Sequence, residues 1–276
     1  MPLKKLQLKA GVNRENTRYT SEGGWYESDK VRFRQGMPEK IGGWQRISTA
    51  TFQGVCRSLH SWVTLVDLTL TSVGTNLKYY LENGGAYYDI TPIRATVTLT
   101  NPFTTANGST TVTVTDAVGG YSDGDFVTFS NASASGGLTL NGEFQITFST
   151  GNTYTITAAS AASSTATGGG TVTATYQISS GTALESPLVG WSAGTWGEGT
   201  WGNGGASTES LRIWSQGNFG EDLILGHRGG PIYLWDASEN TPLENPATLL
   251  SAESGASNVP TAQNIILVSD INRFVF

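Results

Sequence analysis

Charged side chains are scarce in this sequence, because Lys, Arg, Asp and Glu make up only 14% of its 276 residues. The formal net charge is −6, which argues against a strongly basic nucleic-acid-binding protein. Apolar runs are short, and none approaches the roughly 20 residues of a membrane-spanning helix. Lys4 and Lys5 are not followed by an apolar core, so no signal peptide is predicted and assembly in a cytoplasm is expected.

Cysteine and histidine are nearly absent as well. Cys56 is the single cysteine, which excludes an intrachain disulfide and a thiolate metal cluster. We expect it to be a small buried side chain. The two histidines, His60 and His227, belong to no nucleophile elbow and are not accompanied by clustered cysteines. The sequence therefore predicts structural histidines, no bound metal and no cofactor.

Paired carboxylates are the best enzymatic alternative. Asp123 and Asp125 flank Gly124, and Glu221 and Asp222 precede an expected strand. A glycosidase needs two carboxyl groups across a cleft, but an Asp-Gly-Asp sequence is typical of a turn. The ligand pattern also falls short of a calcium loop. Catalytic residues are therefore not predicted.

Helical periodicity is missing, and short alternating or β-branched runs take its place. The sequence predicts an all-β protein. The clearest expected strands cover 31–34, 68–73, 76–81, 86–90, 95–99, 111–114, 126–129, 144–147, 154–157, 171–174, 223–226, 231–236, 265–268 and 273–276. Asn83-Gly84-Gly85 predicts a tight turn, since Asn and Gly adopt positive φ angles at low cost.

Composition divides the chain into three parts. Residues 1–60, rich in glycine and aromatics, predict an extended N-terminal strap. Residues 61–94 and 179–276 predict a β-propeller-like platform. Residues 95–178 are dominated by Thr, Ser, Ala and Gly and lack tryptophan, which predicts an inserted small β-sandwich or barrel with its two ends close together.

The platform contains a possible blade repeat. Strand–turn–strand patterns recur at 68–81, 223–236 and 265–276, and the last two begin about 42 residues apart, within the roughly 40–50 residue period of propeller blades. The alternative is that unrelated β-hairpins look alike. Three partial repeats are fewer than the roughly four blades that close a propeller. The pattern therefore predicts an incomplete propeller, and the ending at Phe276 in mid-strand suggests part of a longer product.

A tryptophan-glycine tract covers residues 190–205, with Trp191, Trp196 and Trp201 spaced five apart. Exposed aromatic rings among glycines suit a subunit interface or stacking on sugar rings. The third interpretation is a long loop or hairpin folded back on its own domain. The sequence leaves these three alternatives open.

The opening segment resembles a known phage family. The matching pieces are Gly11-Val12-Asn13-Arg14, Thr17-Arg18-Tyr19, Gly24-Trp25-Tyr26, Val31-Arg32-Phe33, Gly36-Met37-Pro38 and Ile41-Gly42-Gly43-Trp44. Similar runs open the tail nozzle or hub proteins of short-tailed, podovirus-like bacteriophages, also called tail stabilisation proteins. The resemblance covers about residues 10–94 and 187–276, whereas 95–178 resembles small β-domains inserted in phage structural proteins.

The resemblance implies a β-propeller-based virion subunit without catalytic residues. Six copies would form a ring at the distal end of the tail, continue the DNA channel from portal and adaptor, and contact fibres or a needle. DNA would pass through the lumen without specific binding. We expect Trp25, Tyr26, Phe33 and Trp44 to anchor the strap on its own propeller or on a neighbour, with Trp191, Trp196 and Trp201 as further interface candidates.

Two other functions stay open from the sequence. The first alternative is a receptor-binding tail fibre or glycan-binding protein that uses the inserted domain or the tryptophan tract. The second is a glycan-cleaving propeller enzyme that uses Asp123 and Asp125.

Overall fold

A computed structural model describes residues 9–15, 17–20, 22–43, 46, 48–182, 211–238, 242–269 and 274–276. The chain divides into two compact units, Met1–Thr49 and Ala50–Phe276, and each is described by itself. The predicted all-β class is confirmed, because the regular elements of the described part are antiparallel strands and two short 3-10 helices, η1 (Pro242–Glu244) and η2 (Leu250–Ala252).

The N-terminal unit contains one hairpin, β1 (Val31–Arg34) and β2 (Met37–Lys40). Gln35 and Gly36 make the turn with φ angles of 50° and 80°, and two positive φ values match the twist that a two-residue hairpin requires. An isolated parallel bridge joins Val12 to Trp25. The expected strand at 31–34 is present as β1, and it pairs with β2.

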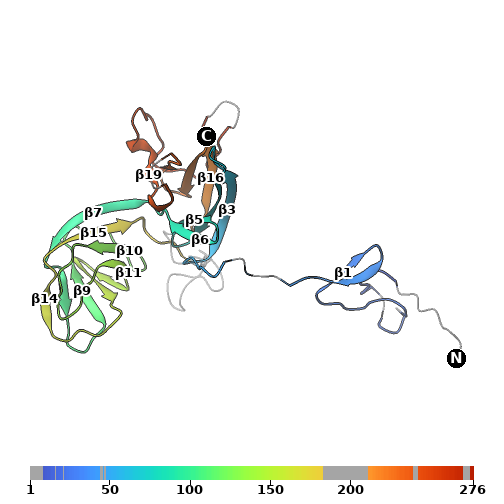
Figure 1. The fold of residues 1–276 in the computed structure, drawn as a ribbon, viewed down its shortest axis with the longest axis horizontal. Coiled ribbons are helices and arrows are strands. Elements are labelled where there is room, and N and C mark those ends of the chain that lie inside the picture. The colour runs from blue at the N-terminus through green and yellow to red at the C-terminus, as the bar shows by residue number, and fades with distance from the viewer. Residues whose placement is uncertain are drawn as a thin grey trace, which may run out of the picture. The chain divides into compact units, whose positions relative to one another are not determined.

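The second unit begins with a four-stranded antiparallel sheet, named blade 1 (Figure 1). Its strands, in spatial order, are β3 (Cys56–Val63), β4 (Thr69–Thr75), β5 (Tyr79–Asn83) and β6 (Ala86–Asp89). Gly84 and Gly85 have φ angles of 57° and 91° and turn β5 into β6, as the sequence predicted. Strand β3 was not expected at this length, and it begins before the predicted end of the strap at residue 60.

A second four-stranded sheet, named blade 2, follows later in the chain. Its strands, in spatial order, are β16 (Trp214–Phe219), β17 (Asp222–His227), β18 (Tyr233–Trp235) and β19 (Thr248–Leu249). The expected pairing of 223–226 with 231–236 is present as β17 and β18, with register Leu223↔Trp235.

The two blades share one hydrophobic cluster. It consists of Leu70, Tyr79, Leu81, Ile90, Ile178, Trp214, Leu223, Leu225, Tyr233, Trp235 and Ala247. The rings of Tyr79 and Trp214 meet edge to face at 4.7 Å, and Trp214 Nε1 donates to the backbone oxygen of Thr75 at 2.7 Å. Burial of these apolar faces against each other holds the two sheets together.

The C-terminal hairpin adds a partial third layer. Val268 pairs with Val275, and the backbones of Leu267 and Phe276 exchange two hydrogen bonds. Val268 and Val275 pack with the buried Ile224 of blade 2 and Ile266. The other face of blade 2 therefore carries these two paired segments, but they meet through a single isolated bridge, so the expected full strands at 265–268 and 273–276 are not present among the described residues.

Residues 93–177 form two further sheets, named the sandwich. One sheet has the order β11 (Gly142–Gln145), β10 (Phe126–Ser130), β15 (Thr171–Gln177) and β7 (Ile93–Thr100). The other has the order β12 (Phe148–Thr150), β13 (Thr153–Thr157), β9 (Thr111–Thr115), β8 (Phe103–Thr105) and β14 (Ala166–Gly168). Among the described residues the sheets do not join into a closed barrel, so the sandwich alternative is the one observed.

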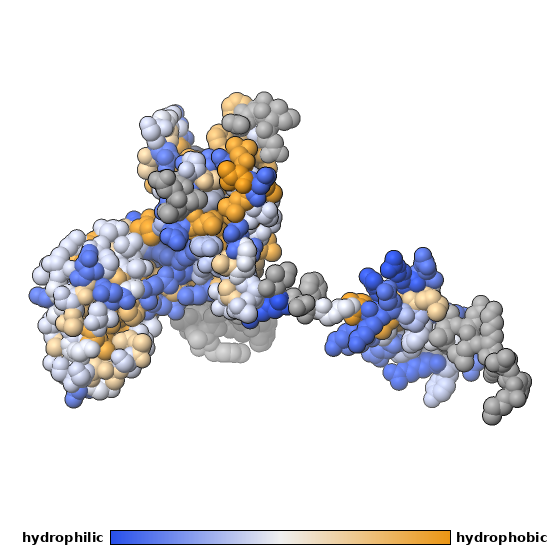
Figure 2. All heavy atoms as spheres, viewed as in Figure 1, coloured by the Kyte–Doolittle hydropathy of each residue, from blue (hydrophilic) through white to orange (hydrophobic). Residues whose placement is uncertain are grey.

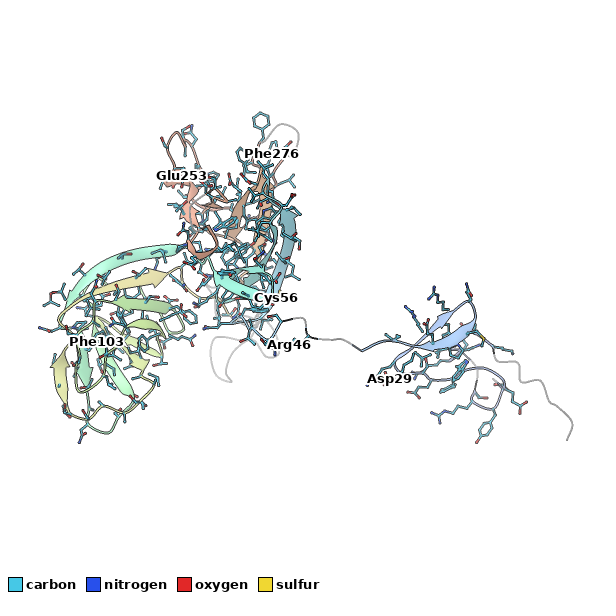
Figure 3. All side chains as sticks on the ribbon, in the orientation of Figure 1. Asp29, Arg46, Cys56, Phe103, Glu253 and Phe276 are labelled. Carbon is cyan, nitrogen blue, oxygen red and sulfur yellow. The ribbon has the colours of Figure 1, made fainter. Side chains whose placement is uncertain are left out.

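The alternation of Thr and apolar residues explains the sandwich. In β9, Val112 and Val114 are fully buried, whereas Thr111 and Thr115 are exposed and Thr113 is half-buried. The core draws on both sheets and includes Phe103, which Figure 3 places within this part. Strands β7 and β15 pair along their lengths, with Tyr176 opposite Ala95, so the two ends of the sandwich leave it side by side (Figure 1).

Candidate functional site and interaction surfaces

The two histidines lie in aromatic surroundings. His60 on β3 stacks on Trp62 with ring centroids 5.7 Å apart, and its Nε2 hydrogen-bonds Asn218 Oδ1 across to β16. His227 meets Trp214 edge to face at 5.7 Å. Burial, with a further contribution from the charge of Arg212, lowers the pKa of His227 to about 4. These contacts give both rings packing roles between and within the blades.

The Asp-Gly-Asp carboxylates do not face each other across a cleft. Asp125 is 1% exposed and accepts hydrogen bonds from the backbone of Ser122 at 3.0 Å and of Ser180 at 2.8 Å. Arg94 lies 3.8 Å from the same carboxylate. Asp123 is exposed. Asp125 therefore secures the turn and the chain that leaves the sandwich, which is a structural use of the carboxylate.

Glu221 and Asp222 join blade elements. The backbone oxygen of Glu221 accepts from Trp62 Nε1 at 3.0 Å, and its carboxylate accepts from the backbone of Leu65 at 3.1 Å. Asp222 accepts from the backbone of Ala237, and burial raises the pKa of its carboxyl group. Across the residues that the structure describes, no three His, Cys, Asp or Glu side chains gather as a metal site would require.

Cys56 is exposed, so the expectation of a buried cysteine was wrong. It begins β3, which lies at the edge of blade 1 and, among the described strands, pairs only with β4. Partial burial raises the pKa of the thiol. In the described part of the chain, no helix is long and apolar enough to cross a membrane.

Three of the expected strap anchors lie in the N-terminal unit. Trp25 packs edge to face on Phe33, with ring centroids 6.1 Å apart. The guanidinium groups of Arg14 and Arg18 lie over the ring of Tyr26 at 5.8 and 5.0 Å. Trp44, Trp191, Trp196 and Trp201 lie outside the described residues. The three described rings thus hold the unit's own loops and hairpin together.

A buried cation that the sequence did not reveal links blade 1 to the sandwich. Lys78 is 2% exposed, and its Nζ lies 2.6 Å from Asp89 Oδ2 and also bonds Glu143 of β11. The same ammonium group lies 4.4 Å from the ring centroid of Phe126. Gln177 Nε2 donates to Asp89 at 2.9 Å. A charge with two carboxylates and an aromatic face fixes the sandwich against β5 and β6.

Apolar side chains are exposed at both ends of the blade stack, and Figure 2 shows hydrophobic atoms at the surface over β3 and β16. On and after β3 they are Leu59, Val63, Leu65 and Val66. On the C-terminal hairpin they are Ile265, Leu267, Phe274 and Phe276. Figure 3 labels Phe276 at this end of the part, and its side chain is 71% exposed. Clusters of this kind are typical of surfaces that another protein element covers.

Comparisons with known proteins give little beyond this geometry. No protein-family model matches the chain, and no curated protein matches it. Among solved structures the chain is similar to the "Phage phi92 endosialidase", with 19% identity and a TM-score of 0.27, over 77% of this chain and 32% of that chain. The chain thus spans about a third of the length of that structure. A TM-score of this size does not establish a common fold, so the function is inferred from the residues and packing of this chain.

Proposed function

We propose that this chain is a non-enzymatic structural subunit of a bacteriophage virion, in the nozzle or hub ring at the distal end of a short tail. The observation that carries the proposal is the repeated hairpin packing of the second unit. Blade 2 packs on blade 1, and the hairpin at 265–276 packs on the far face of blade 2. Face-to-face packing of successive antiparallel sheets supports propeller blades, which are what the resemblance of the opening segment implies.

The contacts of the titratable side chains support a structural role. His60, Asp125 and Glu221 each hold two parts of the fold together rather than converging on one solvent-filled site. In the proposed ring, copies of this chain contact one another, six being the number that the resemblance implies. The ring contacts the adaptor on one side and fibres or a needle on the other, and DNA passes through its lumen without specific binding.

Cryo-electron microscopy of a virion that contains this chain tests the proposal. The expected result is a ring at the tail tip whose subunits fit blade 1, blade 2 and the sandwich. A location in the capsid shell, or single copies at the ends of fibres, would overturn it.

A glycan array with the purified protein separates the nozzle from the receptor-binding alternative. A nozzle subunit gives no signal above a matched control protein, whereas a receptor-binding fibre gives selective binding. Glycan hydrolysis that is lost in D123N and D125N but retained in D67N, a change at another exposed aspartate, would instead establish the enzymatic alternative.

A further inference from the structure

Charge is segregated along the chain. Residues 1–49 contain ten of the sixteen lysines and arginines but five of the twenty-two acidic residues, a net charge of +5. Residues 50–276 contain six basic and seventeen acidic residues, a net charge of −11. The overall value of −6 conceals two oppositely charged units, and opposite potentials favour association of such surfaces.

The described part of the N-terminal unit lacks a buried core. No described side chain between residues 9 and 49 is buried. A unit this small without buried side chains gains little from the hydrophobic effect, and its order depends on a surface supplied by something else. The hairpin offers a suitable contact face, because Arg34 stands opposite Met37 and Met37 is 70% exposed.

Blade 1 offers an open half-face. On its outer side, Tyr80 and Tyr87 pack against Phe52, and Lys78 is engaged by the sandwich. The half nearer β3 is left open, with Leu59 65% and Val63 58% exposed. The loop that follows β3 adds Leu65 and Val66, at 86% and 81% exposure.

Carboxylates border this open half-face. Glu82 lies in the same row of the sheet as Thr71 and Ser61, on the side that carries Leu59 and Val63. Asp67 is exposed at the end of the adjoining loop, and Glu221 bonds the backbone of Leu65. An apolar centre with an acidic rim matches a hairpin that presents methionine beside arginine.

We propose that the N-terminal unit of one copy docks through its β1–β2 hairpin on the open half-face of blade 1 of a second copy. This inference rests on the proposed ring. In that ring each copy supplies its N-terminal unit as an arm and its open half-face of blade 1 as the surface that accepts the arm of a neighbour. The segment of the same chain that leads into blade 1 already occupies the β5–β6 side through Phe52, which favours an arm from another copy for the β3 side.

A protein surface fits this arm better than nucleic acid does. Arg14 and Arg18 pair with Glu27, and Arg32 pairs with Glu39, so three of the ten cations are already engaged by carboxylates within the unit. Phosphate binding requires cations that are available to many phosphates at once. Docking on the acidic second unit requires only a few contacts between cations and carboxylates around an apolar centre.

Disulfide cross-linking of purified full-length protein tests the docking. In a C56S background, chains with M37C are mixed with chains with L59C under mild oxidation. The expected product is a covalent dimer that contains one chain of each kind. V118C replaces L59C in the matched control, since Val118 is an equally exposed apolar residue (69%) on the sandwich, and it is expected to give no dimer. A bond that forms only when both cysteines share one chain, no bond at all, or equal bonding to V118C would overturn the proposal.

A charge exchange tests the electrostatic part. R34E is expected to lower the initial rate of cross-linking by roughly tenfold, because it places like charges together. E82R in the accepting copy is expected to restore the rate. Salt-sensitive retention of the parent chain on double-stranded DNA that R34E abolishes, with no cross-link, would identify nucleic acid as the partner instead. Cross-linking in the absence of a ring at the tail tip would refute the proposed nozzle function but not the docking. A ring at the tail tip without cross-linking would refute the docking but not the nozzle function.

Discussion

Replacing Lys78 with methionine removes the buried cation at the junction of blade 1 and the sandwich while keeping an unbranched side chain of similar size. Two carboxylates, Asp89 and Glu143, then face each other without the ammonium group that bonds both. Breaking a buried ion pair by removing one partner costs about 3–5 kcal/mol. The two carboxylates keep 27% and 31% exposure, so water screens part of their charge and the lower end of that range applies.

We therefore expect K78M to lower the free energy of unfolding by about 3 kcal/mol. For a chain of this size that corresponds to a fall in melting temperature of roughly 6–12 °C. Urea denaturation measures the first quantity and differential scanning calorimetry the second. Hydrogen exchange should show faster opening at β5, which directly follows Lys78, and at β11, which carries Glu143.

Two further variants make this prediction discriminating. K78M/E143Q should recover at least about 1 kcal/mol of the loss, because one unpaired carboxylate is gone. R228M, which removes an exposed cation from blade 2, should change stability by less than about 0.5 kcal/mol. A K78M protein as stable as the parent, or a double variant no better than K78M, would refute the role given to this buried charge.

Three shorter predictions concern the cores. Alanine at Gly74 would place its Cβ 2.7 Å from the ring of Trp214 and should cost about 2 kcal/mol in urea denaturation, whereas G43A, with nothing within 4 Å, should cost far less. The pKa of His227 is about 4 in the folded state against 6.5 in the unfolded state, so the free energy of unfolding should fall by about 2 kcal/mol as the pH drops from 7 to 5. H227Q should lose this pH dependence, whereas H60Q should keep it. Y176F removes the hydroxyl that donates to Asp116 at 2.7 Å and should lower stability by about 2 kcal/mol; a change under about 0.5 kcal/mol would contradict this assignment.

Local pattern was sufficient for most of the strands. Alternation of Thr with Val in 111–114 predicted β9, because a period of two separates a buried face from a solvated one. Asn83-Gly84-Gly85 predicted its turn because positive φ angles strongly favour such residues. Strand β16 was not predicted, since its Ser, Gln, Gly and Asn residues carry no apolar period and are held by pairing with β17.

The sequence by itself determined the all-β class and the hairpins, because these follow from contacts between near neighbours in the chain. Only the tertiary structure decided the roles of individual polar residues. Lys78 looks like a solvated lysine in sequence, yet it is buried because Glu143, 65 positions later, comes to lie against it. In the sequence Asp125 resembles one half of an acidic pair, but in the structure its carboxylate accepts a hydrogen bond from the backbone of Ser180. The burial and pairing of a polar side chain depend on which distant segments of the chain pack together. The pattern of neighbouring residues in the sequence does not specify that packing.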